Sequence, residues 1–287
     1  MSLSVILATY NSPEWLEKVL WGYAAQDTSD FEIVIADDGS GPETRALIDR
    51  MSRETDLTIT HVWHEDRGFR KCEILNKAIL ASAGDYLVFS DGDCIPRRDL
   101  LAQHQRLRRP GHFLSGGHVS LPLSISTAIT PEHIRTGRVA DATWLRSQGL
   151  KPTRKMLRLL AGSRLGRVFD AVTPTRPTWN GGNASAWRED LLAANGYDER
   201  MVWGGLDREL GERLENAGVR GVQIRHRAVV VHLDHPRGYA SEEGVRGNAQ
   251  IREQTRRTRR TRTEYGLDRH REAELIVHRP GAASTSM

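Results

Sequence analysis

The sequence predicts an α/β protein with a mostly parallel sheet flanked by helices. Apolar runs of strand length alternate with longer amphipathic stretches through the N-terminal part of the chain. Alternation of this kind implies right-handed crossovers between parallel strands. Polar residues directly follow three of the apolar runs, at the edge where open α/β sheets bind their ligands. These residues are Thr9-Tyr10-Asn11, Asp37-Asp38 and Asp91-Gly92-Asp93.

Four strands and four helices are predicted for this part of the chain. The strands cover residues 3–8, 31–36, 57–63 and 86–90, and each is an apolar run typical of a buried strand. The first helix begins at Asn11-Ser12-Pro13-Glu14, where a capping side chain, a proline and an acid stand in the expected order, and it runs to about residue 26. The other helices are predicted over residues 42–53, 70–83 and 99–108.

The alternation stops near residue 120. Residues 113–119 are predicted as a strand, and the stretch 121–177 is predicted as an insert with two basic helices, about 131–147 and 152–169. A glycine-rich loop at 179–187 leads into helices at 189–195 and 206–217. The remaining elements are a strand over 222–233, a helix from about 241 to 265, and a disordered tail over 278–287.

Composition places the chain among soluble globular enzymes. Its 287 residues are 38% hydrophobic and 27% charged, and no apolar run reaches the ~18 residues of a membrane span. Cys72 and Cys94 are the only cysteines, which excludes a disulfide scaffold and a cysteine–zinc site. The first residues lack a secretory signal, so we expect a cytoplasmic protein.

Basic residues gather in two clusters, although the net charge is only +4. The segment 151–167 carries six lysines and arginines and no acid, and the segment 252–262 carries six arginines and one glutamate. Such clusters favour a phosphate-rich partner, which is an anionic lipid, a nucleic acid or a polyanionic acceptor. A solvated helical face explains them equally well.

The acidic triplet Asp91-Gly92-Asp93 can direct two carboxylates at one point. Hard oxygen ligands suit Mg²⁺ or Mn²⁺, which commonly bridge substrate phosphates, although a D-x-D triplet alone also occurs in plain turns. Neither a G-x-G-x-x-G dinucleotide motif after the first strand nor a G-x-x-x-x-G-K-[ST] phosphate loop is present. We therefore expect phosphate to be handled through a metal ion.

Five segments together resemble the family 2 glycosyltransferases with the GT-A fold. They are SVILATYNSPEWLEKVL, FEIVIADDGS, NKAILASAGDYLVFSDGDCIP, WNGGNASAWRED and NGYDERMVWGGLDRELGERLENAG. The resemblance covers about residues 1–120 and 178–235, and the second stretch is similar to chondroitin-polymerase-like and galactosyltransferase-like enzymes. It implies inverting transfer of a sugar from a nucleotide diphosphate donor, most often UDP, with a divalent metal.

The resemblance also implies roles for single residues on the donor side. Tyr10 and Asp38 match the positions that hold the base, and Asp91 matches the acid beside the ribose. Among Arg67, Arg70 and Lys71 we favour Arg70 as the basic contact; an exposed arginine at a helix start is the alternative. The implied donor site comprises Ala8, Tyr10, Asp38, Arg70, Asp91, Gly92, Gly182 and Asn183.

The metal ligands implied by the resemblance are Asp93 and His232. An imidazole with carboxylate oxygens fits Mn²⁺ somewhat better than Mg²⁺. His235 is the poorer candidate because it lies three residues further on, and a surface histidine is the simpler interpretation of it.

The general base implied by the resemblance is Asp207, in Trp203-Gly204-Gly205-Leu206-Asp207, which aligns with W-G-G-E-D. A helix-terminal aspartate favoured by the helix dipole is the alternative. Leu206 replaces the glutamate that often contacts the acceptor, which leaves the acceptor sugar open. We assign acceptor binding to Trp203, with a core tryptophan as the alternative, and to Glu209 as a partial substitute.

Four regions follow from this assignment. They are a nucleotide-sugar-binding half (1–120), a basic helical insert on the acceptor or membrane side (121–177), an acceptor and catalytic half (178–235), and a basic C-terminal helix with a flexible tail (236–287). The expected partners are a UDP-sugar and a glycan or lipid-linked acceptor, with peripheral association with an anionic inner membrane as a further expectation.

Two other functions stay open at this point. A sugar-1-phosphate nucleotidyltransferase also uses a parallel sheet and Mg²⁺, but its G-x-x-T-R-L-type start is missing here. A non-catalytic nucleotide-sugar-binding or membrane scaffold protein would keep the same fold. Nucleic-acid binding by the arginine-rich segment is a weaker expectation.

Overall fold

The computed structural model describes residues 2–160, 162–235 and 241–280, with backbone only for residues 162 and 163. It confirms the α/β class: an eight-stranded sheet has the order β11-β3-β2-β1-β4-β8-β6-β9, and a three-stranded sheet has the order β5-β10-β7. The large sheet consists of β1 (Leu3–Thr9), β2 (Glu32–Asp37), β3 (Ile59–Trp63), β4 (Tyr86–Asp91), β6 (His112–Ser115), β8 (Ala184–Trp187), β9 (Arg220–Gln223) and β11 (Ile276–His278). The small sheet consists of β5 (Cys94–Pro96), β7 (Gly117–Ser120) and β10 (Val229–His232).

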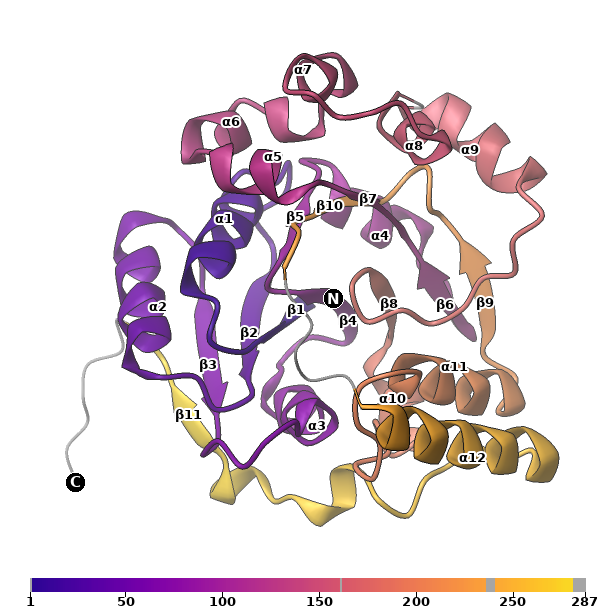
Figure 1. Cartoon of the computed structure of the whole chain (residues 1–287). Coiled ribbons are helices and arrows are strands. Elements are labelled where there is room, and N and C mark those ends of the chain that lie inside the picture. Colours follow the sequence, from indigo (N-terminus) through magenta and orange to yellow (C-terminus); the bar gives the residue numbers. More distant parts are fainter. Residues whose placement is uncertain (1, 161, 236–240, 281–287) are drawn as a thin grey trace.

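Helices cover both faces of the large sheet (Figure 1). Those of the first half are α1 (Pro13–Ala24), α2 (Pro42–Glu54), α3 (Lys71–Ala81) and α4 (Leu100–Leu107). Those of the C-terminal part are α10 (Arg188–Ala193), α11 (Leu206–Asn216) and α12 (Glu242–Thr258), followed by the 3₁₀ turns η3 (Leu267–Arg269) and η4 (Glu272–Glu274). One apolar cluster joins α1 and α2 to the sheet and the other joins α3, α10 and α11 to its opposite face, so the central strands are apolar on both sides.

The parallel centre of the sheet brings three strand ends together. β1 lies between β2 and β4, with Ala8 opposite both Ala36 and Asp91, and with Thr9 opposite Asp37. Because these strands run in the same direction, the acids that follow β2 and β4 lie at one edge. The antiparallel strand β8 then pairs with β4 and carries the glycine-rich loop to this edge.

Two of the predicted strands are wrong, because each divides between the two sheets. The stretch 113–119 forms β6 and β7, and the stretch 222–233 forms β9 and β10. In the second case Asp170 accepts bonds from the His226 backbone N–H at 2.9 Å and from Arg227 Nε at 2.7 Å, which fixes the turn between the strands. The predicted glycine-rich loop likewise ends in a strand, β8.

The insert is helical as predicted, but its helices are shorter. They are α5 (Leu123–Ala128), α6 (Pro131–Arg135), α7 (Ala142–Ser147), α8 (Leu157–Leu160) and α9 (Gly162–Val172), with the 3₁₀ turns η1 (Arg138–Ala140) and η2 (Arg154–Met156). The predicted helix over 131–147 is interrupted because Gly137 has φ +76° and the Asp141 side chain caps α7. Figure 1 shows these helices together along one side of the molecule, next to β5, β7 and β10.

The C-terminal segment returns to the far edge of the sheet. Helix α12 ends earlier than predicted, where Arg259 adopts φ +50°, and β11 then pairs antiparallel with β3. The predicted tail over 278–287 therefore begins inside a strand, and its residues 281–287 lie outside the described part. Within the described ranges, no helix has both the length and the apolar character needed to cross a membrane.

Candidate active site

The D-x-D triplet lies at the carboxyl end of β4. Asp91 is the last residue of the strand, and the Gly92 N–H donates to the Ala8 carbonyl at 2.7 Å. A Cβ on Gly92 would lie 3.1 Å from that same carbonyl oxygen, so a side chain here would crowd β1. The tight turn directs Asp91 and Asp93 away from β4 toward different partners.

Asp93 lies beside two histidines, His232 at the end of β10 and His235 in the segment that follows it. Its Oδ2 is 2.9 Å from His235 Nε2 and its Oδ1 is 3.7 Å from His232 Nε2. Burial disfavours the ionised carboxyl, but His235 and His232 outweigh it and hold the pKa of Asp93 below its usual range. Pairing of β10 with β5 places His232 opposite Cys94, which explains how residues so distant in sequence meet.

This cluster fits a divalent metal. One ligand atom each from Asp93, Cys94 and His232 lie within 4.8 Å of one another, and His235 adds a second imidazole on the same carboxylate. A carboxylate with imidazoles is a donor set that Mn²⁺ accepts. Sequence reasoning ranked His235 as the poorer candidate, and nothing in the sequence reveals that the chain bends after β10 and brings it to Asp93.

Asp91 is bound to Lys71, the first residue of α3. Lys71 Nζ lies 2.6 Å from Asp91 Oδ1. Burial alone would lower the pKa of the Lys71 ammonium, but Asp91, Asp207 and Asp93 together raise it above its ordinary value. Lys71 therefore remains a cation amid three carboxylates.

Arg70, expected in preference to Lys71 as the basic contact to the nucleotide, is bound to Glu73 and to the Glu65 backbone instead. Its guanidinium donates to Glu73 Oε2 at 2.9 Å and to the Glu65 carbonyl at 2.5 Å. The two adjacent residues point to different partners because α3 begins here, and Lys71 alone faces the carboxylates. Arg67 is paired with Glu65 on the surface.

Asp207 lies near Asp91 and Lys71, in the first turn of α11. Its Oδ1 is buried and accepts no hydrogen bond from any described residue. Burial raises the pKa of Asp207 to about 6, with Lys71 opposing the shift and Asp91 adding to it. A carboxyl of this kind is ionised near neutral pH and still basic enough to take a proton.

The loop before β8 holds the two acids in place. A Cβ on Gly181 would lie 2.6 Å from Asp207 Oδ1, and a Cβ on Gly182 would lie 3.1 Å from Asp91 Oδ2. Trp179 anchors the loop, since it is fully buried and its Nε1 donates to the Tyr197 hydroxyl at 2.9 Å. The two glycines thus let the backbone approach both carboxylates.

Asn183, expected among the donor contacts, has its side chain bound to other parts of the protein. Its side chain is 2% exposed and bonds to His104 Nε2 and to the carbonyls of Gly117 and Ala228. All three bonds are between 2.9 and 3.1 Å, which leaves this amide occupied. It fixes the ends of both sheets against each other.

The expected base-binding residues lie beyond β1 and β2. Tyr10 is exposed, and its hydroxyl donates to Asp66 Oδ2 at 2.9 Å. Asp38 is buried and accepts from His64 Nε2 at 2.8 Å and from the Arg70 N–H at 3.0 Å. Tyr10 thus presents an open ring, whereas both oxygens of Asp38 already have partners.

On the expected acceptor side, the assignment of Glu209 needs correction. Glu209 is 1% exposed and is bound by Arg213, which is fully buried, and by the Thr255 hydroxyl. It faces inward because it follows Asp207 by two residues and so lies on the core side of α11. Trp203 is part-buried at the turn before α11.

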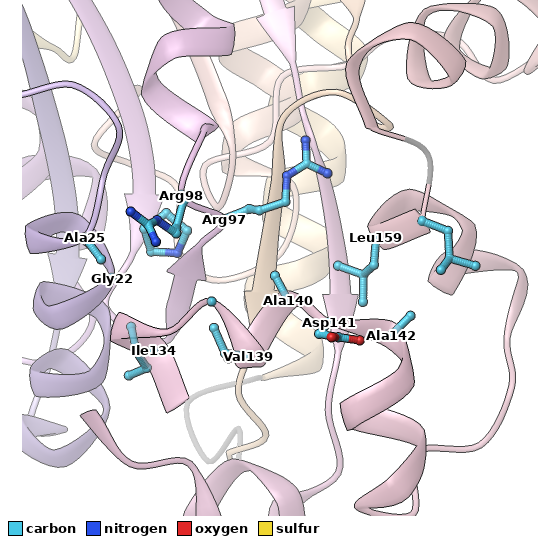
Figure 2. A pocket seen from close by; sticks show the side chains of 13 residues that line it. Gly22, Ala25, Arg97, Arg98, Ile134, Val139, Ala140, Asp141, Ala142 and Leu159 are labelled. Atoms are coloured by element: carbon cyan, nitrogen blue, oxygen red, sulfur yellow. The ribbon is translucent and has the colours of Figure 1, made fainter. Parts of the chain in front are cut away.

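A cavity of about 410 Å³ lies away from these residues, between α1, β5 and the insert (Figure 2). None of the candidate donor, metal or base residues lines it.

Comparisons with known proteins match both halves of the chain. Residues 4–113 match the model of Glycosyl transferase family 2, and residues 165–236 match the N-terminal domain of galactosyltransferase. Validoxylamine A glucosyltransferase of Streptomyces hygroscopicus subsp. jinggangensis is 30% identical over 76% of this chain and 52% of its own. Chondroitin synthase of Escherichia coli is 29% identical over 75% of this chain and 32% of its own, so this chain spans about half or less of these two relatives.

Solved structures support the fold. The TarS protein of Staphylococcus aureus, residues 1–349 with UDP, superposes with a TM-score of 0.59 at 16% identity, covering 88% of this chain and 64% of that one. A mannosyltransferase of Pyrobaculum calidifontis in complex with GDP-Man and Mn²⁺ superposes with a TM-score of 0.54 at 22% identity, covering 83% and 58%. These are GT-A structures, and the predicted GT-A fold is confirmed.

Proposed function

We propose that this chain, a family 2 glycosyltransferase, transfers a sugar from a UDP-sugar to a hydroxyl of a glycan or glycolipid with inversion at the anomeric carbon. The observation that carries the proposal is the position of Asp207. Its carboxylate has an unbonded, buried oxygen and lies beside Lys71 and Asp91, next to the Asp93–histidine cluster. Base, donor contacts and metal ligands thereby occupy one edge of the sheet.

We propose inversion because direct displacement needs a single carboxylate as base, and Asp207 can supply it. In direct displacement the acceptor oxygen attacks opposite the departing diphosphate, and a single base removes the acceptor proton. Asp207 takes that proton on its free Oδ1. Lys71 stays protonated and helps keep the Asp207 carboxyl ionised until acceptor binding.

Asp93, His232 and His235 would hold the divalent ion, with Mn²⁺ favoured over Mg²⁺. When bound, such an ion supplies charge neutralisation for the diphosphate leaving group. Asp91 is held by its ion pair with Lys71 and lies close to the backbone of Gly182. We assign it to the ribose side of the donor.

The remaining assignments complete the proposal. Tyr10 offers an exposed ring for the base, with Asp38 beneath it and Ala8, Gly92 and Gly182 as close backbone approaches. Trp203 is proposed to face the acceptor. The four regions 1–120, 121–177, 178–235 and 236–287 serve donor binding, acceptor or membrane contact, catalysis and a basic C-terminal extension.

UDP release tests this proposal. The full chain is incubated with a panel of UDP-sugars and hydroxyl acceptors, with Mn²⁺ or with EDTA. We expect UDP release from one donor, dependent on the metal and increased by acceptor. Release of pyrophosphate from sugar 1-phosphate and UTP would instead identify a nucleotidyltransferase.

The same panel separates the other outcomes. Binding of UDP without turnover for any donor would identify a non-catalytic nucleotide-sugar-binding protein. Turnover with GDP- or TDP-sugars only would reject the UDP assignment while leaving the transferase itself in place. Turnover that EDTA leaves unchanged would contradict the metal assignment to Asp93 and the two histidines.

A further inference from the structure

Helix α9 turns small and polar residues toward the protein core and exposes an apolar stripe. Its fully buried positions are Gly166 and Asp170, and Phe169 is half-buried beside the His226 ring, while Leu165, Val168 and Val172 face outward. A surface helix of a globular protein normally does the reverse and turns its apolar stripe to the core. The spacing of the three outward residues, i, i+3 and i+7, makes them one continuous stripe.

This orientation is fixed by specific bonds. Asp170 accepts from the His226 N–H at 2.9 Å, from His226 Nδ1 at 3.0 Å and from Arg227 Nε at 2.7 Å. A Cβ on Gly166 would lie 2.8 Å from the His226 carbonyl oxygen, so this side of α9 packs directly on the turn after β9. Rotating the helix to bury its apolar stripe would break the Asp170 bonds.

Helix α8 extends the apolar surface. Leu157 and Leu160 are exposed one turn apart. Together with the α9 stripe they give five large exposed apolar side chains on two consecutive helices, here called the apolar row. Their exposed fractions lie between 45% and 68%. Exposed apolar residues occur singly on most proteins, but a row on consecutive helices marks an interaction site.

Basic residues flank this row, and we call the whole surface the basic–apolar face. Its members are Leu157, Leu160, Leu165, Val168 and Val172 with Lys151, Arg154, Lys155, Arg164 and Arg167. Asp170 is the only acid between residues 151 and 172, and it is buried. Within residues 151–172 the outward positions therefore combine apolar side chains with positive charge, and the nearby acid Asp141 caps α7 at the neighbouring cavity.

We propose that the basic–apolar face docks on an anionic lipid bilayer. Apolar side chains enter the boundary between headgroups and acyl chains, and the cations contact the anionic headgroups. A nucleic acid or an acidic polysaccharide would account for the cations but leave the apolar row in water. The charge and the apolar row together therefore select lipid.

The cavity next to α8 belongs to the same side of the molecule. Leu159 and Leu160 line it, with Ile134 and Val139 of the insert, and the exposed Arg98 stands at its margin (Figure 2). Insertion of Leu160 into lipid would thus bring this cavity of about 410 Å³ to the bilayer surface.

The face is also connected to the candidate active site. Arg158 of α8 donates to the His118 carbonyl at 2.6 Å, and Lys155 Nζ lies 3.3 Å from His118 Nε2. The His118 ring is 6.4 Å from that of His232. Docking would therefore hold the catalytic edge close to the membrane, where a lipid-linked acceptor is presented; this consequence alone rests on the proposed function.

Vesicle flotation tests the docking. The full chain is mixed with vesicles of phosphatidylcholine alone or of equal parts phosphatidylcholine and phosphatidylglycerol. We expect binding to the anionic vesicles only, weakened by salt. Arg164→Glu/Arg167→Glu should reduce binding at least about tenfold, since each cation near an anionic surface contributes roughly fivefold.

The apolar contribution has its own variant and matched controls. Leu165→Ser/Val168→Ser should also reduce vesicle binding several-fold. Arg257→Glu/Arg259→Glu on the other basic cluster and Ile276→Ser on β11, exposed by 57%, should leave it unchanged. Circular dichroism of each variant confirms that it is folded.

Three results would overturn the proposal. They are absence of wild-type binding to the anionic vesicles, equal loss of binding in the control variants, and no effect of the Leu165→Ser/Val168→Ser change. In the last case, retained binding to soluble heparin would identify a polyanion site instead. No donor or acceptor is present, so failure here leaves the proposed transfer reaction untouched.

Discussion

Asp207, the proposed base, shows at the scale of one residue how burial and neighbouring charges set the basicity of a carboxyl. Burying a carboxylate costs stability, and here burial outweighs Lys71 and the hydrogen bonds from Gly181 and Tyr197, so that the pKa of Asp207 is raised to about 6. Lys71 limits the shift, so the group is mainly ionised at neutral pH. Its Oδ1 has no partner among the described residues and so can accept a hydrogen bond from an incoming hydroxyl.

Asp207→Asn is expected to lower turnover by about 10²-fold or more, since general base catalysis contributes about 10²- to 10⁴-fold. Binding of UDP should change little, because Asp207 is proposed to contact the acceptor and not the nucleoside. Turnover is measured by UDP release and binding by calorimetry. The midpoint of thermal unfolding should be unchanged or higher at neutral pH, since the variant removes a buried charge. A variant with wild-type turnover would exclude Asp207 as the base.

The pH dependence of transfer should follow the same carboxyl. Burial favours the neutral form, so below a pH of about 6 Asp207 is protonated and cannot accept a proton. We expect the rate at saturating metal and donor to rise through about pH 6 and then level off. UDP affinity measured over the same range serves as the control. A rate that stays constant from pH 5 to pH 8 would contradict the assignment.

At the scale of the elements, the loop between the insert and β8 determines the geometry of the site. Gly181 and Gly182 each touch a different carboxylate, and Trp179 fixes the loop against Tyr197. The short strand β8 holds the loop by pairing with β4, the same strand that ends in Asp91. The donor-side acid and the proposed base are thereby positioned by one continuous segment.

Gly181→Ala should reduce transfer strongly, because its Cβ would lie 2.6 Å from Asp207 Oδ1 and would displace the carboxylate. Gly247→Ala is the matched control, since a Cβ there meets nothing within 4 Å inside α12. The control should keep full activity and gain roughly 0.5–1 kcal/mol of stability from the better helix former. UDP release and urea denaturation measure the two effects. Equal activity of Gly181→Ala and Gly247→Ala would show that transfer does not need the close approach of Gly181 to Asp207.

At the scale of the whole molecule, a buried ion pair within α11, the helix of the proposed base, is hydrogen-bonded to the C-terminal part. Glu209 and Arg213 of α11 are paired at 2.8 Å, and Glu209 also accepts from Thr255 of α12. Arg213 in turn donates to the carbonyls of Ala194 and Gly196. Figure 1 shows α11 and α12 side by side, and this network is one of the contacts between them, with the Arg252–Glu212 ion pair as another.

Arg213→Met is expected to lower the free energy of unfolding by about 3–5 kcal/mol, because it leaves the Glu209 carboxylate buried and unpaired. Glu209→Met/Arg213→Met should recover part of this loss, but not all, since two carbonyls and the Thr255 hydroxyl remain without their partners. Urea denaturation measures both. Arg256→Met removes a half-exposed arginine that pairs with Glu253 and, at 3.4 Å, with Glu212. It should have little effect, because Glu212 keeps its pair with Arg252. If Arg213→Met lowered the free energy of unfolding no more than Arg256→Met does, the stabilising role of this network would be contradicted.

The sequence predicted the parallel half of the fold well, and for a clear reason. Residues 3–8, 31–36 and 86–90 are apolar runs buried on both faces, so neighbours in sequence alone determine them. The prediction failed at 113–119 and 222–233, where an apolar run leaves one sheet and enters another. The breaks carry Gly116-Gly117 and Arg225-His226-Arg227, but glycines and polar residues also occur inside single strands, so they do not by themselves mark a change of sheet.

The sequence by itself determined the fold class, the strand ends that carry the acids, and Asp207 at the start of α11. These depend on short-range patterns and on motif spacing. Only the tertiary structure decided that Lys71 and not Arg70 meets Asp91, that His235 joins His232 at Asp93, and that Glu209 faces the core. It likewise decided that α9 buries an aspartate and exposes its apolar stripe. The physical reason is the same each time: which way a side chain points depends on the packing of elements that are distant in sequence, and the burial and charge of those neighbours set its chemistry.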